Sequence, residues 1–410
     1  MPILEDAAKA LVNFNDTGLG LAEHSHRSEL ATKIINEAKA DLSTFLEIPD
    51  DYEVLFMQGG GSGQFAATAY NFAGAWVARK HKELGSDDGS IEQLKSAVKD
   101  LKIDYIITGG WSQKAAAEAE RLFGPEHVNI VADSRKLNAG KFGIIPDEDT
   151  WNLSRDSAMV YYCDNETVHG VEFPGFPKRL EPGPDGPVVV ADMSSNILSR
   201  KIPIRNFSAI FFGAQNNLGS TGITVVVIKK SFLAQPSAAL LRQLALPIPP
   251  RALEYETIAK NNSLYNTLSI FEYACSCQYI LELIHISSVY IAGRVLKKLL
   301  LQHPSRVQGQ QTLSEQKAQL IYAALAAHPE IYHIIPHKSV RSRMNICFRI
   351  EGGDAAEEAF LKQGTAIGLT GLKGHRDLRG IRASNYNSIP LEGAAKLANY
   401  IGTFASQRGH

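Results

Sequence analysis

The fold class is decided by one stretch near the N-terminus: DYEVLFMQ (51–58), then GGG (59–61), then SGQFAATAYNFAGAWVAR (62–79). The first eight residues are rich in aromatic and branched aliphatic side chains, and this composition predicts a strand. The three glycines end that strand. The small-residue segment that follows predicts a helix, so the stretch as a whole indicates a strand, a tight turn and a helix.

The same succession recurs along the first half of the chain. Six further short apolar strands are predicted, at 104–108, 127–132, 159–163, 188–192, 209–213 and 223–228, with a helix at 113–122. Short, unbroken apolar strands separated by helices indicate a mostly parallel sheet that is covered on both faces. We therefore expect an α/β fold with a mostly parallel seven-stranded sheet between helices.

The C-terminal part has a different pattern. A proline-rich segment, LPIPPR at 246–251, is followed by predicted helices at 268–301 and 313–327 and by an alternating strand at 344–351. We expect a large α/β domain over residues 1–267 and a smaller C-terminal α+β domain over residues 268–410. The proline-rich segment is expected to act as a hinge near the boundary.

The composition restricts the function class. Lys plus Arg is 42 and Asp plus Glu is 43, a near balance that argues against binding nucleic acid or an anionic membrane through bulk charge. Four cysteines are too few for a disulfide framework, and no stretch approaches the roughly 20 apolar residues of a membrane span. No cluster has zinc spacing, and Cys275 and Cys277 are interpreted as core residues. These features predict a soluble, cytoplasmic, metal-free protein.

Three features follow the predicted strands, where an α/β sheet binds its ligands. The GGGSGQ turn (59–64) would present backbone N–H groups at a helix N-terminus, which suits a phosphate. Asp192 ends an apolar strand and, if buried, needs a cationic or N–H partner, such as a pyridinium nitrogen. An ordinary helix cap is the structural alternative for Asp192. A polar loop, AQNNLGSTG, occupies 214–222.

Together these segments resemble the phosphoserine aminotransferase family, which is of fold type I and depends on pyridoxal phosphate. The resemblance runs almost from end to end and is carried by NFNDTGLGLAEHSHRS (13–28), QGGGSGQFAA (58–67), TGGWS (108–112), DNETVHGVE (164–172), ADMSSNILSR (191–200), NSLYNT (262–267) and GLKGHRDLRGIRASNYN (371–387).

The resemblance implies a cofactor site. Trp111 would stack on the pyridine ring, Thr167 would lie near the phenolic oxygen and Asp192 would face the pyridine nitrogen. The cofactor phosphate would be held by Gly61, Ser62 and Gln215, together with Asn266 and Thr267 from the other subunit of a homodimer.

It also implies a site for a small anionic metabolite. The substrate phosphate and carboxylate would be bound by His26, Arg27, His375, Arg376 and Arg382, and Arg379 is expected to converge on the same pocket. Arginine suits this task because its planar guanidinium can grip a carboxylate or phosphate with two hydrogen bonds.

One departure from the family pattern changes the functional expectation. The family has Gly-Ala-Gln-Lys-Asn where this chain has GAQNN (213–217), so Asn216 stands at the Schiff-base lysine position. An asparagine amide is neither a useful nucleophile nor a base, and the lysine would serve as both. Lys229 and Lys230 are expected at the far end of the sheet and do not replace it.

Three functions are therefore open. The first is a repurposed enzyme of specialised metabolism that performs acid–base chemistry without transamination: a cyclisation, condensation, elimination or isomerisation, with Asn216, His24 and His375 as its catalytic candidates. Pyridoxal phosphate or pyridoxamine phosphate would then be bound noncovalently or not at all. The second is a genuine phosphoserine aminotransferase, acting on 3-phosphohydroxypyruvate and glutamate, that carries a Lys-to-Asn substitution. The third is a non-catalytic pseudoenzyme.

Overall fold

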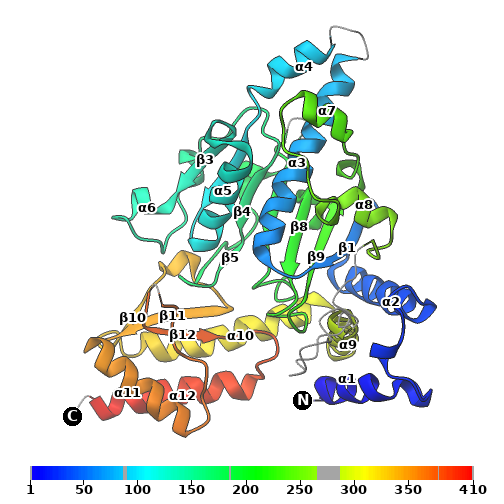
Figure 1. Ribbon diagram of the computed structural model, residues 1–410. Coiled ribbons are helices and arrows are strands. Elements are labelled where there is room, and N and C mark those ends of the chain that lie inside the picture. Colours follow the sequence, from blue (N-terminus) through cyan, green and yellow to red (C-terminus); the bar gives the residue numbers. More distant parts are fainter. Residues whose placement is uncertain (1, 86–89, 184–185, 266–286, 377, 409–410) are drawn as a thin grey trace.

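The protein is represented by a computed structural model that describes residues 2–85, 90–183, 186–265, 287–376 and 378–408. Its centre is a seven-stranded sheet (Figure 1). The strands are β1 (Tyr52–Gln58), β2 (Ile103–Ile107), β3 (Val128–Asp133), β4 (Val160–Cys163), β7 (Val189–Asp192), β8 (Ala209–Gly213) and β9 (Ile223–Lys229). Their spatial order is β1-β9-β8-β7-β4-β2-β3. β9 is antiparallel to both of its neighbours and every other adjacent pair is parallel. The predicted α/β fold with a mostly parallel sheet is confirmed.

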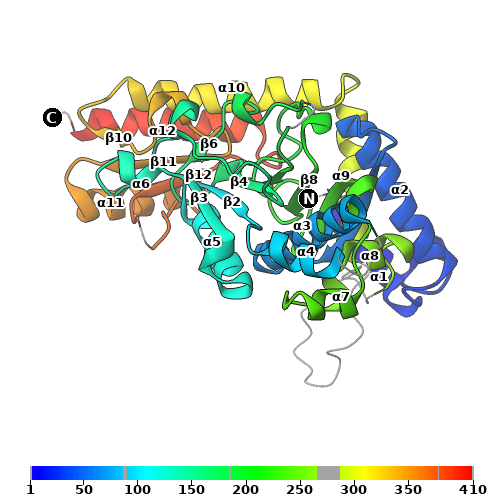
Figure 2. The same cartoon turned by 90° about the horizontal axis from the view of Figure 1, so that it is seen from above.

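Helices cover both faces of this sheet (Figures 1 and 2). One face is packed by α3 (Gly61–Leu84), α4 (Ser90–Val98), α5 (Gly110–Phe123), α7 (Ala238–Gln243) and α8 (Tyr255–Lys260). The other is packed by α1 (Pro2–Val12), α2 (Glu29–Leu46) and α9 (Ser287–Gln302). Successive strand residues point to opposite faces, so Tyr161 belongs to the first core and its neighbour Tyr162 to the second.

The sequence analysis does not predict α1 or α2, although α2 carries an ordinary amphipathic signal. Its buried residues recur at three- and four-residue intervals, at Ala31, Ile35, Ala38 and Leu42. Ser28 begins the helix by accepting a hydrogen bond from the backbone N–H of Ala31 (3.2 Å). Local sequence is therefore sufficient to specify this helix.

The C-terminal part forms a separate antiparallel sheet with its own core. Its strands are β10 (Tyr332–Ile334), β11 (Asn345–Ile350) and β12 (Ile381–Ser384), and its helices are α10 (Val307–Ala326), α11 (Gly353–Ala366) and α12 (Leu391–Arg408). In both views α10 runs from the region of α9 to this small sheet (Figures 1 and 2). The proposed domain boundary at 267/268 and most of the helix predicted at 268–301 lie outside the described residues.

The topology determines where a ligand site can form. The carboxyl ends of β1, β2, β3, β4, β7 and β8 lie at one edge of the sheet, together with the first residue of β9. Gln58 at the end of β1 pairs with Ile223, whereas Tyr52 at its start pairs with Lys229. Lys229 is thus at the opposite edge, as predicted, and cannot serve a site at the carboxyl ends.

A buried ionic cluster joins the large sheet to the C-terminal part. Glu172 belongs to a two-stranded ribbon of β5 (Asn165–Glu166) and β6 (Val171–Glu172), and its carboxylate pairs with the Arg343 guanidinium (2.6 Å). Asn196 donates to Glu172 (3.0 Å) and to Asp164 (2.6 Å), and Asp164 in turn pairs with Arg200. Burial opposes ionisation of Glu172, but Arg343 and Arg200 outweigh it and hold the pKa of Glu172 at about 2.

We expect Glu172→Gln to destabilise the protein by about 3 kcal/mol at pH 7, because the substitution removes the carboxylate that neutralises the half-buried Arg343. The folded-state pKa of Glu172 lies below the value of 4.5 for a free side chain, so its contribution is full above pH 4.5 and falls as the pH drops toward 2. Urea unfolding of the two proteins at pH 7 and at pH 4 measures the difference. The exposed Glu181→Gln is the control, and equal stabilities of all three proteins at pH 7 would contradict the assignment.

Candidate active site

A cavity of about 340 Å³ lies beyond the carboxyl ends of β4, β7 and β8. It is lined by Gly61, Trp111, Cys163, Asn165, Thr167, Asp192, Ser194, Ser195, Gln215, Asn216, His375, Arg382 and Tyr386. The sequence-based site residues among them are Gly61, Trp111, Thr167, Asp192, Gln215, Asn216, His375 and Arg382. Segments separated by more than 300 residues therefore meet in one cavity.

Asp192 is a buried carboxylate without a cation. It is 6% exposed, and one of its oxygens accepts hydrogen bonds from the Ser194 backbone N–H (2.8 Å) and hydroxyl (2.6 Å). None of the described residues forms an ion pair with it. Burial raises the pKa of Asp192 to about 6, against the opposing effect of the Ser194 hydrogen bonds. The site thus holds an acidic group whose ionised form lacks a positive partner.

Trp111 stands in the first turn of α5 and is fixed from two directions. Its backbone N–H donates to one oxygen of Glu166 (2.9 Å), and its indole N–H donates to the Thr167 hydroxyl (2.9 Å). The second Glu166 oxygen accepts from the backbone N–H and the hydroxyl of Ser112 (2.8 and 2.7 Å). The indole therefore has a set orientation at the wall of the cavity.

Glu166 was missed by the sequence analysis. The residue was visible inside the motif DNETVHGVE, but its role depends on the approach of β5 to the N-terminus of α5. Burial raises the pKa of Glu166 to about 7, although the hydrogen bonds from Ser112 and Trp111 favour the ionised form. Glu166 supplies the carboxylate that a helix N-terminus prefers.

The N-terminus of α3 is open toward the cavity at Gly61. No side chain caps this helix, and Gly60 precedes it with φ +117°, a backbone angle that favours glycine. Gly59 must also be small, because an added Cβ would lie 2.7 Å from the backbone of Gly222. The turn can therefore present backbone N–H groups to an anion.

Asn216 lines the cavity, and its side-chain amide donates to the Ser194 carbonyl (3.1 Å). Its neighbour Asn217 is buried and donates to the carbonyls of Ser195 (3.2 Å) and Ile197 (3.0 Å). No lysine is among the residues that line this cavity within the described ranges. An amide consequently occupies the wall in which the family resemblance would put an amine.

The C-terminal part closes the cavity with His375, Arg382 and Tyr386. The Nε atom of Arg382 is buried and has no hydrogen-bond partner in the described chain. The side-chain oxygen of Asn165 is likewise buried and unpartnered, while its amide group donates to Ser195 (2.7 Å). The Arg382 Nε–H and the Asn165 side-chain oxygen are thus available to form hydrogen bonds with a ligand in this cavity.

Several predicted residues are not among those that line the cavity: Ser62, His24, His26, Arg27 and Arg376. Ser62 is exposed in the first turn of α3, and the other four remain predictions for the site. Asn266 and Thr267 lie outside the described residues. The expectation that Arg379 converges on the pocket is wrong, because its exposed guanidinium pairs with Asp354 of α11 (2.5 Å).

Comparison with known proteins decides the family. The aminotransferase class-V profile matches residues 3–85 and 93–280. Phosphoserine aminotransferase of Saccharomyces cerevisiae is 40% identical, over 99% of this chain and 94% of that protein. The Drosophila melanogaster enzyme is 37% identical, over 98% and 94%. This chain belongs to the phosphoserine aminotransferase family of class-V aminotransferases.

Solved structures agree with this assignment. Phosphoserine aminotransferase from Bacillus circulans subsp. alkalophilus matches with a TM-score of 0.80 and 31% identity, covering 100% of this chain and 96% of that one. The pyridoxal-phosphate-bound enzyme from Trichomonas vaginalis matches with a TM-score of 0.78 and 31% identity, covering 98% and 96%. The predicted fold type I and the predicted family resemblance are both confirmed.

The cavity fits a pyridoxal-type group on this structure's own chemistry. Asp192 lacks the cation that a protonated pyridine would supply, Trp111 offers an oriented ring, and α3 offers an uncapped N-terminus.

Within the described ranges, no group of three His, Cys, Asp or Glu side chains is arranged to hold a metal ion. None of the helices described has both the length and the apolar composition to cross a bilayer.

The absence of an ion-pair partner for Asp192 among the described residues leads to a prediction about the stability of the folded protein. Asp192→Asn keeps an oxygen for both Ser194 bonds and removes the unpaired charge, so we expect the ligand-free variant to be more stable at pH 8 by up to about 3 kcal/mol. The folded-state pKa of about 6 exceeds the ordinary 3.8, so the penalty in the unmodified chain is complete above pH 6 and absent below pH 3.8. The advantage of the variant should therefore disappear by pH 4, as measured by urea unfolding at the two pH values.

Glu172→Gln is the matched control for Asp192→Asn. Glu172 is equally buried, but its pairing with Arg343 outweighs the effect of burial and holds its pKa at about 2, so its neutralisation should destabilise the protein at pH 8. A destabilisation of similar size in both variants would show that Asp192 is already compensated and would contradict the prediction.

Proposed function

We propose that this chain binds pyridoxal phosphate or pyridoxamine phosphate noncovalently in the cavity and recognises the substrates of phosphoserine aminotransferase, 3-phosphohydroxypyruvate and glutamate. The observation that carries the proposal is the open set of complementary groups around one cavity: the unpaired Asp192 carboxylate, the oriented Trp111 ring and the unpartnered Arg382 Nε. The 40% identity to the yeast enzyme over 99% of the chain supports the substrate class.

Each group has a definite task in this proposal. A bound pyridoxal group supplies an electron sink that stabilises negative charge at the substrate Cα. Asp192 would keep the ring nitrogen protonated, and Trp111 would hold the ring face against its indole. The N-terminus of α3 and Gln215 would bind the cofactor phosphate, and Arg382 with His375 would bind the substrate anion.

Asn216 limits what this site can catalyse. An amide cannot hold the cofactor covalently and cannot carry the proton at the substrate Cα. General acid–base catalysis alone typically contributes about 10²–10⁴-fold, so we expect slow transamination in the unmodified chain. The proposed site is therefore a phosphoserine aminotransferase pocket that lacks the lysine amine.

A second candidate rests on the same residue. Asn216 lines the cavity together with His375, and this pair favours a repurposed enzyme that performs acid–base chemistry without transamination on a small anionic metabolite. The full-length similarity to phosphoserine aminotransferases favours the first candidate over this one. A chain that binds neither cofactor nor substrate would instead be a pseudoenzyme.

The proposal includes a homodimer. His26, Arg27 and Arg376 do not line the cavity of the single chain, and a second subunit could bring such groups to it. Sedimentation at micromolar concentration should give a dimer, and a monomer that binds the cofactor with full affinity would remove this part of the proposal.

Restoring the amine tests the cofactor site. We expect the unmodified chain to bind pyridoxal phosphate reversibly, with borohydride leaving no cofactor mass on the protein. Asn216→Lys should become covalently labelled and should transaminate 3-phosphohydroxypyruvate at least about 10²-fold faster. Asn216→Gln is the matched control, since it is polar but has no amine, and it should resemble the unmodified chain. Covalent labelling of the Gln variant would reveal another lysine and contradict the assignment.

Arginine substitutions test the substrate site separately. Arg382→Gln should weaken phosphoserine binding at least about tenfold, because a charge-assisted hydrogen bond is lost at a buried atom. Arg379→Gln should leave it unchanged, since that side chain pairs with Asp354. Calorimetric titration distinguishes the two, and equal effects of both substitutions would argue against Arg382 as the anion-binding group.

A further inference from the structure

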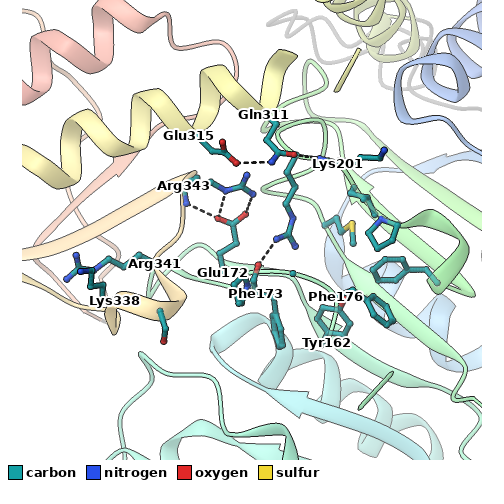
Figure 3. A pocket seen from close by; sticks show the side chains of 18 residues that line it. Tyr162, Glu172, Phe173, Phe176, Lys201, Gln311, Glu315, Lys338, Arg341 and Arg343 are labelled. Atoms are coloured by element: carbon teal, nitrogen blue, oxygen red, sulfur yellow. Dashed lines mark hydrogen bonds and ion pairs between the residues drawn. The ribbon is translucent and has the colours of Figure 1, made fainter. Parts of the chain in front are cut away.

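A second cavity, of about 310 Å³, lies on the opposite face of the large sheet from α3 and α5. It is enclosed by β4, β6, the segment 200–207, the middle of α10 and the segment 338–343 (Figure 3). It shares no lining residue with the candidate active site. Its size is at the lower end of the range for cavities that bind small molecules.

One wall of this cavity is aromatic. The rings of Phe176 and Phe207 meet edge to face at 4.9 Å, and those of Tyr162 and Phe173 lie 4.6 Å apart. Tyr162 also contacts Phe207 at 6.4 Å, so the four rings form one continuous surface. Such a surface favours a flat apolar or aromatic group.

The remaining lining is strongly basic. Five cationic side chains, those of Arg200, Lys201, Lys338, Arg341 and Arg343, contribute to it, against the carboxylates of Glu172 and Glu315. Figure 3 shows Arg343, Arg341 and Lys338 on the side opposite Tyr162 and Phe176. With the Asp164 carboxylate that pairs with Arg200 included, five cations against three anions leave two positive charges in excess, which favours an anionic ligand.

The cations of this cavity differ in how far they are neutralised. Arg343 and Arg200 are paired with Glu172 and Asp164. Lys201 and Lys338 form no ion pair with any described residue, and both are exposed. Arg341 also forms no ion pair with a described residue, but its guanidinium lies over the Tyr322 ring (5.3 Å). The two ammonium groups are therefore the more accessible cations for a carboxylate from solution.

Tyr162 places a free hydrogen-bond donor at this cavity. Its side chain lines the cavity and is fully buried, yet its hydroxyl has no hydrogen-bond partner in the described chain. Burial raises the pKa of Tyr162 well above its usual value, so the hydroxyl stays protonated and can donate. A buried hydroxyl without a partner is costly, and an oxygen of a ligand would relieve that cost.

We propose that this cavity is a second ligand site, which binds a small carboxylate carrying an aromatic ring. The ring packs against the wall formed by Tyr162, Phe173, Phe176 and Phe207. The carboxylate accepts a hydrogen bond from the Tyr162 hydroxyl and is attracted at longer range by the cations around the cavity, Lys201 and Lys338 among them.

Phenylacetate, with phenylacetamide as its uncharged counterpart, tests the proposal by calorimetric titration of the full chain. We expect phenylacetate to bind with a dissociation constant in the millimolar range or below, and phenylacetamide to bind more weakly. Tyr162→Phe should weaken phenylacetate binding about three- to tenfold, since one hydrogen bond is lost. Lys201→Met and Lys338→Met should each weaken it about two- to fivefold.

Tyr161→Phe is the matched control. Tyr161 precedes Tyr162 in β4, is equally buried and also carries an unpartnered hydroxyl, but it belongs to the core on the other face of the sheet. Neither substitution removes a protein hydrogen bond, so both variants should fold, and thermal unfolding checks this. Tyr161→Phe should leave phenylacetate binding unchanged.

Arg382→Gln distinguishes binding in the second cavity from binding in the candidate active site. This substitution should leave phenylacetate affinity unchanged. The proposal is overturned if phenylacetate does not bind at tens of millimolar. It is also overturned if Tyr161→Phe and Tyr162→Phe have equal effects, or if Arg382→Gln abolishes binding while Tyr162→Phe does not.

Discussion

Buried carboxylates at the carboxyl ends of β4 and β7 organise this molecule, because each must find compensation for its lost hydration. Asp164 and Glu172 find it in Arg200 and Arg343, and this pairing joins the large sheet to the C-terminal part. Glu166 finds it in the backbone of α5 and thereby orients Trp111. Asp192 receives only the hydrogen bonds of Ser194. Asp192, which forms no ion pair with any described residue, lines the candidate active site.

The strands of the large sheet could be predicted because each contains a short apolar run, a signal that needs no tertiary information. The run is buried on both faces in the central strands and only half-buried in the edge strand β3. Asp192 was found because it ends such a strand, whereas Trp111 was found through the family resemblance of TGGWS (108–112). Glu166 could not be assigned from sequence, since its partners lie more than 50 residues away. Arg379 was misplaced for the same reason: its guanidinium is taken by Asp354, which stands 25 residues earlier on α11.

The large sheet presents different groups to the two cavities that it separates. On one face, strand ends and glycine turns expose backbone and carboxylate groups to a polar ligand. On the other, the side chains of the strand interior and of segment 200–207 give an aromatic surface edged by cations. The alternation of side chains along β4 sends Tyr161 to one core and Tyr162 to the other. Tyr162 lines the second cavity and the next residue, Cys163, lines the candidate active site, so neighbouring residues can change the two sites independently.

In the loop after β8, two adjacent residues have different roles: Asn216 contributes to the wall of the cavity and Asn217 holds the loop in place. Asn217 anchors the loop: it donates to the carbonyls of Ser195 and Ile197 and accepts from the backbone N–H of Asn387 in the C-terminal part. Asn216 makes a single hydrogen bond, to the Ser194 carbonyl, and otherwise contributes to the wall of the cavity. Asparagine and lysine codons differ only in their third base. Because the anchoring bonds of the loop belong to Asn217, a single nucleotide change at position 216 would alter the wall of the cavity without removing them.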